Sequence, residues 1–360
     1  MANVNLSLLE KLDLMLDRYN ARQLQYTTPV FSKLYDQWCA KNKVTPNKVR
    51  LNTGTEAFWV GDPQAEFVVI YFHGGGFSIE GGDEQFQFWG DDVLPDLKAA
   101  GKSVAFLFLQ YTLVPHGTYP VQVTEAIEAV RYVTQDLKRS ADTILLGGDS
   151  AGGNMALAVV SQALHPSPDL PKVTLDKPLK GLVLVAPWVR FVYHTASVAE
   201  NKYKDIVTAN VAEVWSSTYL AGKATSPYNE PGTADASWWV DAPVEHIVCV
   251  AGRDELLHDA VTEWVAKYKE AKGADSITFV VAEHEVHIAP LIELKLGDKT
   301  PTQQGEALKS CLASMDKGKA RIHVPVCLSE QKLDLKFATN NNAFLYSAFT
   351  FFFYSTSTFF

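Results

Sequence analysis

Six short apolar runs, rich in β-branched residues, constrain the fold of this 360-residue chain more than any other feature. They lie at 66–72, 103–111, 142–148, 181–187, 246–252 and 276–282. Each run is continuous, which is typical of strands covered on both faces. Helical patterns separate most of them, at roughly 86–100, 120–139, 153–164, 258–272 and 301–315. This alternation predicts an α/β fold: a mostly parallel, doubly wound sheet flanked by helices. Upstream, 48–54 and 56–61 could pair as an antiparallel hairpin at the sheet edge.

Three segments fall outside this alternation. Residues 190–245 are too long for a simple crossover, and we interpret them as a cap inserted into a catalytic domain at 46–316. Residues 1–45 begin with leucines at helical spacing and are interpreted as N-terminal cap helices. Residues 317–360 form a Phe/Ser/Thr-rich tail, which we place outside the core. The tail could be an edge strand, a membrane tether or sequence beyond the true end of the domain.

Composition narrows the functional classes. The formal net charge is −9 without a Lys/Arg-rich run, which argues against binding nucleic acid or an anionic membrane. The four cysteines are far apart, which suggests neither a disulfide framework nor a zinc site. The first 20 residues lack the pattern of a signal peptide, so we expect a cytoplasmic protein. The oligomeric state stays open.

The segment "GDSAG" at 148–152 follows a predicted strand and opens a predicted helix. It matches G-x-S-x-G, the motif in which a sharp strand-to-helix turn exposes a nucleophilic serine. Here that serine is Ser150, beside Asp149 and Ala151. Alone, the segment could equally be an ordinary glycine-rich turn.

A second segment, "HGGG" at 73–76, follows the predicted strand at 66–72. Bare backbone N–H groups in such a run can stabilise the negative oxygen of a tetrahedral intermediate. We expect the oxyanion hole to comprise Gly75, Gly76 and Ala151, with His73, Gly74 and Asp149 supporting the motifs. A glycine run alone could be a flexible turn, but the two motifs in this order favour a hydrolase site.

Together these motifs resemble the hormone-sensitive-lipase branch of the α/β-hydrolase superfamily. The resemblance covers roughly residues 45–315 and includes "YTLVPHGTYP" at 111–120, which is similar to the branch's Y-R-L-A-P-E-x-x-x-P. Thr112 and His116 stand where that pattern has arginine and glutamate, so local support of the site could differ. The resemblance implies an α/β-hydrolase fold with a helical cap. The sequence is also similar to fungal members, some of which act in secondary metabolism.

The fold requires the order serine, acid, histidine. Asp254 follows the run at 246–252 and matches the acid of the family's D-x-L-x-D pattern, with Glu255 as a weaker competitor and Asp259 as support for the next helix. His287 follows the last run and matches the family's base, in preference to His284. The predicted catalytic residues are therefore Ser150, Asp254 and His287.

These residues predict a serine esterase that acts on a small or medium acyl ester, such as an acetylated or polyketide-type metabolite. Trp188, Trp215 and Tyr219 could line its pocket or form the cap's own core. We expect neither a cofactor nor a metal, since His284 and His287 lack metal-site spacing. The alternatives are amide or carbamate hydrolysis, a lyase, cyclase or condensation step at the same site, and a catalytically silent ligand-binding homologue.

Overall fold

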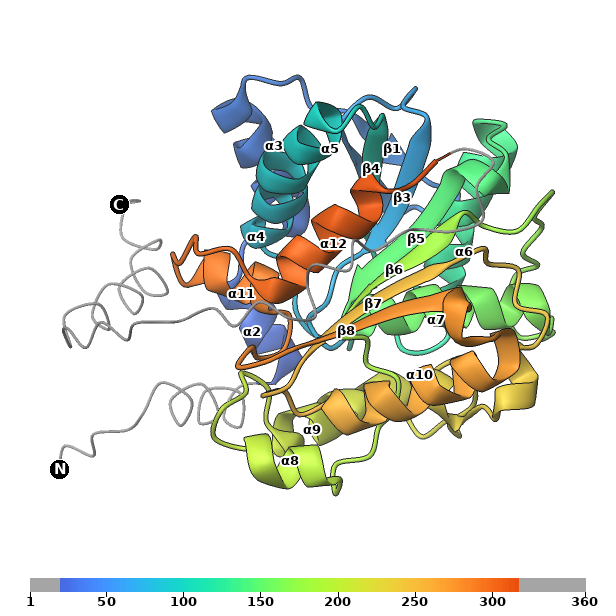
Figure 1. Ribbon diagram of the computed structural model, residues 1–360. Coiled ribbons are helices and arrows are strands. Elements are labelled where there is room, and N and C mark those ends of the chain that lie inside the picture. The colour runs from blue at the N-terminus through green and yellow to red at the C-terminus, as the bar shows by residue number, and fades with distance from the viewer. Residues whose placement is uncertain (1–19, 317–360) are drawn as a thin grey trace, which may run out of the picture.

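The computed structural model describes residues 20–316, which form one eight-stranded sheet with helices on both faces (Figure 1). The strand order is β1-β2-β4-β3-β5-β6-β7-β8. The strands are β1 (Lys48–Arg50), β2 (Glu56–Val60), β3 (Phe67–Phe72), β4 (Val104–Gln110), β5 (Ile144–Asp149), β6 (Gly181–Val185), β7 (Ile247–Gly252) and β8 (Ile277–Ala282). β2 is antiparallel to β1 and β4, and all the other pairs are parallel. The predicted mostly parallel sheet and its edge hairpin are confirmed.

The helices form two layers. α2 (Ala21–Thr27), α3 (Phe31–Asn42), α4 (Asp83–Phe86) and α5 (Leu94–Ala99) are followed by α6 (Val121–Arg131), α7 (Ala151–Leu164), α8 (Ala196–Asn201), α9 (Ala209–Leu220), α10 (His258–Lys272), α11 (Ala289–Lys295) and α12 (Gln303–Ala313). In Figure 1, α3, α5 and α12 lie on one side of the sheet, and α7 and α10 lie on the other. The helix predicted at 86–100 is instead α4, a π-helical stretch (Gln87–Val93) and α5, in which Pro95 occupies the first turn.

Alternate residues of the buried strands enter two hydrophobic cores. On β3, Val68 and Ile70 face the core shared with α6, α7 and α10, whereas Phe67 and Val69 face the core shared with α3, α5 and α12. This explains the continuous apolar runs, because each strand buries both of its faces. The layered packing fixes the carboxyl ends of the parallel strands at one edge of the sheet, where α/β folds bind ligands.

The segment between β6 and β7, which we name the β6–β7 insertion (residues 186–246), contains α8, α9 and two 3₁₀ turns, Pro231–Thr233 and Ala236–Trp239. The amphipathic pattern at residues 1–19 and the tail at 317–360 lie outside the described residues. No helix within 20–316 is both long and apolar enough to cross a bilayer.

Candidate active site

Ser150 lies in a strained turn between β5 and α7. Its backbone adopts φ 52° and ψ −116°, a conformation that non-glycine residues rarely occupy. The turn is possible because its neighbours are small: a Cβ on Gly148 would overlap the backbone of Gly152, and one on Gly152 would overlap the carbonyl of Phe72. The geometry therefore fits the sharp turn that the GDSAG segment predicts, and it sets the hydroxyl at the carboxyl end of β5.

Asp149 connects this turn to the HGGG segment. Its Oδ2 accepts a hydrogen bond from the Gly74 N–H (3.0 Å), and its Oδ1 accepts from the Tyr71 hydroxyl (3.0 Å) and the Gln85 amide (3.1 Å). The side chain is fully buried, and burial raises its pKa to about 6 although Tyr71 and Gln85 oppose the rise. Asp149 thus fixes the two glycine-rich loops relative to each other.

The three glycines of the HGGG segment differ in what their amides do. The N–H of Gly74 is committed to Asp149. Gly75 and Gly76 adopt positive φ angles of 100° and 58°, and within residues 20–316 their N–H groups have no hydrogen-bond acceptor. Ala151 is the first residue of α7, where a backbone N–H has no intrahelical partner. Within residues 20–316, Gly75, Gly76 and Ala151 therefore carry backbone N–H groups without a hydrogen-bond acceptor.

His73 and Tyr111 contact the backbone of the HGGG segment and stabilise it. The ring of Tyr111 stacks on His73 at 4.2 Å between centroids, and its hydroxyl donates to the carbonyls of His73 (2.9 Å) and Gly74 (3.2 Å). Burial lowers the pKa of His73 to about 4, so the ring is neutral and its Nδ1–H donates to the Gly74 carbonyl at 2.7 Å. His73 is thus a structural residue of this loop.

The segment after β4 departs from the family pattern at two positions. Thr112 donates its backbone N–H and its hydroxyl to the carboxylate of Glu125, both at 2.7 Å. His116 is exposed. Glu125 of α6 therefore anchors the strand end that carries Tyr111.

His287 is buried in the β8–α11 loop (residues 283–288), with 2% of its surface exposed, whereas His284 is exposed. Its Nδ1 lies 3.8 Å from Oε1 of Glu255, whose side chain is fully buried. Burial alone would lower the pKa of His287, but the carboxylates of Glu255, Asp205 and Asp149 outweigh burial and raise that pKa. Of the two histidines, His287 is thus the one that is buried and lies near a buried carboxylate.

The acid is where the structure differs from the sequence-based expectation. Asp254 was expected to face His287, but its Oδ1 instead lies 2.9 Å from Nζ of Lys204. Glu255 faces His287, and its Oε2 accepts from the Gly252 N–H at 2.9 Å. Within the β7–α10 loop (residues 253–257), the adjacent Asp254 and Glu255 side chains thus have different partners. A signal was present: the spacing of D-x-L-x-D fits Glu255, Leu257 and Asp259, with glutamate in the first position.

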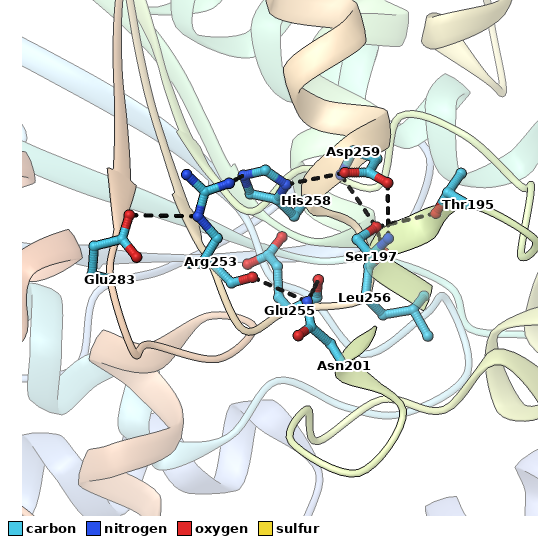
Figure 2. A network of polar contacts seen from close by, with 9 residues as sticks. All are labelled: Thr195, Ser197, Asn201, Arg253, Glu255, Leu256, His258, Asp259 and Glu283. Atoms are coloured by element: carbon cyan, nitrogen blue, oxygen red, sulfur yellow. Dashed lines mark hydrogen bonds and ion pairs between the residues drawn. The ribbon is translucent and has the colours of Figure 1, made fainter. Parts of the chain in front are cut away.

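A second serine, histidine and aspartate lie close together, as Figure 2 shows, but their hydrogen bonds are structural. The Ser197 hydroxyl donates to the Leu256 carbonyl (2.9 Å) and accepts from the Asp259 N–H (3.3 Å). His258 directs Nδ1 to Asp259 and Nε2 to Arg253, so neither ring nitrogen faces Ser197. These contacts attach α8 to the start of α10, in agreement with a supporting role for Asp259.

The three candidate pocket aromatics are not equivalent. Tyr219 is fully buried and stacks on Phe77 at 3.8 Å between ring centroids, and Trp188 is also buried and lies 6.1 Å from Phe77. Trp215 of α9 is half-buried and covers Gly76 so closely that a Cβ there would overlap its ring. Trp215 is thus the aromatic side chain of α9 that lies against Gly76.

Within the described part of the chain, no group of three or more histidine, cysteine, aspartate and glutamate side chains could hold a metal ion. The described cysteines, Cys39, Cys249 and Cys311, are free and buried. Cys327 lies outside residues 20–316.

Several known proteins are similar to this chain. Carboxylesterase NlhH of Mycobacterium tuberculosis is 28% identical over 47% of this chain and 52% of its own length. An acetyl-hydrolase of Streptomyces hygroscopicus is 26% identical over 62% of this chain and 75% of its own length. An esterase of Gibberella moniliformis is 33% identical over 39% of each chain. The chain thus spans about half the length, or less, of the mycobacterial and Gibberella relatives.

Solved structures show the same fold. A crystal structure of EstE5 superposes with a TM-score of 0.60 at 20% identity, covering 87% of this chain and 92% of that one. Carboxyl esterase 2 of the fungus Tuber melanosporum gives 0.60 at 17% identity, covering 78% and 87%. A family model described as alpha/beta hydrolase fold matches residues 69–290, which is more than half of the chain. The protein belongs to the α/β hydrolase fold family.

Proposed function

We propose that this protein is a serine hydrolase that cleaves a carboxylic ester through an acyl-enzyme formed on Ser150. The observation that carries the proposal is the strained Ser150 turn, which Asp149 joins to the HGGG loop with its unused amides. A buried histidine next to a buried carboxylate completes the groups that acyl transfer needs. The relatives named as esterases, and the likeness to the hormone-sensitive-lipase branch, support the same reaction class.

The proposed reaction has two steps. His287 takes the proton of the Ser150 hydroxyl as its oxygen attacks the ester carbonyl, and the amides of Gly75, Gly76 and Ala151 stabilise the oxyanion. His287 then returns the proton to the departing alcohol. In the second step His287 takes a proton from water as the water attacks the acyl carbonyl. The imidazolium then gives this proton to the Ser150 oxygen as the acyl–oxygen bond breaks, which releases the acid and the free serine. No cofactor enters this scheme.

We assign the supporting acid to Glu255 in place of Asp254. A carboxylate at Nδ1 of the base holds the imidazole in the tautomer that leaves Nε2 free for the serine, and it stabilises the imidazolium. Oε1 of Glu255 lies 3.8 Å from that nitrogen, whereas Asp254 is paired with Lys204.

We further propose that the β6–β7 insertion, together with α2 and α3, is a cap that selects a small or medium acyl ester. Trp215 supports a small acyl group, because its ring occupies the space over Gly76. α2 also contacts the loop after HGGG, since the Gln25 amide donates to the carbonyls of Ser78 and Val114, both at 2.7 Å. The acetyl-hydrolase relative and the fungal resemblance make an acetylated metabolite a suitable first substrate to test.

A fluorophosphonate probe tests the nucleophile directly. We expect the wild-type protein to be labelled at Ser150, and the Ser150→Ala variant to take up no label. Ser161→Ala is the matched control, because Ser161 is a buried serine of the same α7 helix whose hydroxyl accepts from the Trp238 indole at 3.3 Å. Labelling at another residue, or an unlabelled wild type, would overturn the proposal. Hydrolysis of p-nitrophenyl acetate should follow the labelling.

A further inference from the structure

Asp205 is a buried carboxylate that the sequence motifs do not mark. It lies in the β6–β7 insertion between α8 and α9, with 1% of its surface exposed. Its Oδ2 accepts the N–H of Leu256 at 2.6 Å, and its Oδ1 accepts the N–H of His287 at 3.1 Å. Oδ1 also accepts the N–H of Ile206 at 2.7 Å. One side chain therefore joins the insertion to both the β7–α10 loop and the β8–α11 loop.

A buried carboxylate is costly unless hydrogen bonds replace its hydration. The three groups that donate to Asp205 are all backbone amides, which satisfy its oxygens without neutralising its charge. Burial raises its pKa to about 6, His287 opposes this rise, and Glu255 adds to it. The negative charge of Asp205 therefore favours the protonated form of the His287 imidazole.

Three acidic groups raise the pKa of His287. Glu255 approaches from the β7–α10 loop, Asp205 from the insertion and Asp149 from the end of β5, and each of them favours the imidazolium. An imidazolium forms whenever the base takes the serine proton. Negative charge fixed beside it therefore stabilises the species that the reaction creates.

We propose that Asp205 is a positioning residue, which holds the loops of Glu255 and His287 in register through their backbone amides and adds a fixed negative charge beside the imidazole. This inference rests on the proposed function. It extends the site into the insertion, so that the segment proposed to select the substrate also helps to orient the base.

The neighbouring contacts keep Asp205 from moving independently of the β7–α10 loop. The side-chain amide of Asn201 donates to the carbonyls of Arg253 (3.0 Å) and Glu255 (2.9 Å). Ser197 of α8 bonds to the Leu256 carbonyl, as Figure 2 shows. Asp205 thus stands at the end of a segment that is already attached to this loop.

The first test is Asp205→Asn, which removes the negative charge. It also replaces one carboxylate oxygen, an acceptor, by an amide N–H₂ group, which cannot accept a hydrogen bond from the backbone. We expect kcat to fall about ten- to a hundredfold, and the acidic limb of kcat/KM to move to lower pH by roughly one unit. The matched control is Glu213→Gln, the same charge change at an exposed residue of α9, which should leave kcat and the pH profile at wild-type values. A wild-type kcat and pH profile in Asp205→Asn would overturn the inference.

The second test is Asp205→Glu, which keeps the negative charge but adds a methylene group. Its oxygens then cannot accept from the N–H groups of Leu256 and His287 at the present distances. We expect a reduced kcat with an unshifted acidic limb, and a wild-type kcat in this variant would also overturn the inference. It keeps the inference testable if the Asn variant does not fold. Fluorophosphonate labelling distinguishes failure of the proposed function from failure of this inference. An unlabelled wild type refutes the proposed function. A labelled wild type whose kcat and pH profile do not change on substitution of Asp205 refutes only this inference.

Discussion

At the scale of single residues, the surroundings of His287 determine the pH at which the site can work. A general base must be neutral to accept a proton, and the carboxylates of Glu255, Asp205 and Asp149 raise the pKa of His287 above 6.5. Activity should therefore disappear as the pH falls through this raised pKa. We expect the acidic limb of kcat/KM to lie above pH 6.5, because kcat/KM reports the free enzyme. The pH dependence of p-nitrophenyl acetate hydrolysis checks this, with the exposed His284→Ala as control.

The same residue enters the stability of the fold with a defined sign. A histidine whose folded pKa lies above its unfolded value contributes stability that is fully present below the unfolded pKa. That contribution is lost as the pH rises through the folded pKa. His287 therefore stabilises the folded state at low pH, where its imidazole is protonated and cannot act as a base.

Glu255 and Asp254 provide a direct comparison of adjacent carboxylates. We expect Glu255→Gln to lower kcat by roughly 10³- to 10⁴-fold, because the imidazole loses the carboxylate that lies 3.8 Å from its Nδ1 and stabilises the imidazolium. Asp254→Asn removes a half-exposed ion pair with Lys204 and should change kcat by less than about threefold. Steady-state kinetics of the two variants decide between the residues, and the opposite ranking would restore Asp254 as the acid.

The sequence could predict most of this site but not the direction of a loop side chain. Ser150, His287 and the HGGG loop follow from motifs whose backbone geometry is fixed by glycine and by strand ends. The choice between Asp254 and Glu255 depends on which of the two side chains turns inward, and Asp254 pairs instead with Lys204, which is 50 residues away in the sequence. Asp205 carries no motif because its partners are backbone amides, which any sequence provides.

At the scale of elements, α9 carries Trp215, whose ring limits the space over Gly76 of the proposed oxyanion hole. The Trp215→Ala variant should lack the ring that lies against Gly76, which leaves room for a longer acyl chain. We expect the ratio of kcat/KM for p-nitrophenyl butyrate to kcat/KM for p-nitrophenyl acetate to rise roughly tenfold, because the extra methylene groups of butyrate then fit. The control is Trp238→Ala, since Trp238 belongs to the same insertion but packs on His165 and Tyr228. An unchanged ratio in Trp215→Ala would place the acyl pocket elsewhere.

The elements themselves were predicted to within about two residues where burial dictated the pattern. Each continuous apolar run became a strand because both of its faces are covered, as β3 shows with six buried residues in succession. The run at 86–100 was harder to predict, because a π-helical stretch and Pro95 interrupt a pattern that is helical by spacing alone. Local irregularity of this kind depends on packing against other elements: Gly90 in that stretch lies directly against Trp38 of α3.

At the scale of the whole molecule, the two cores share one sheet and the β6–β7 insertion is not a separate body. Tyr219 of α9 stacks on Phe77 after HGGG, and Trp239 of the insertion packs on Trp264 of α10. We therefore expect tryptophan fluorescence and far-UV circular dichroism to report coincident thermal transitions, with activity lost over the same interval. An earlier fluorescence transition with loss of activity would mean that the insertion unfolds on its own.

The attachment of α8 to the β7–α10 loop has a consequence for the redesign of this protein. Exchanging the whole insertion with that of a relative would remove Asn201, Ser197 and Asp205 together, and with them the supports of the loop that carries Glu255. A graft limited to α9 would retain these supports and still replace Trp215. New substrate range should therefore be sought in chimeras whose junctions fall after Asp205, near Thr208, where α9 begins with its own side-chain cap.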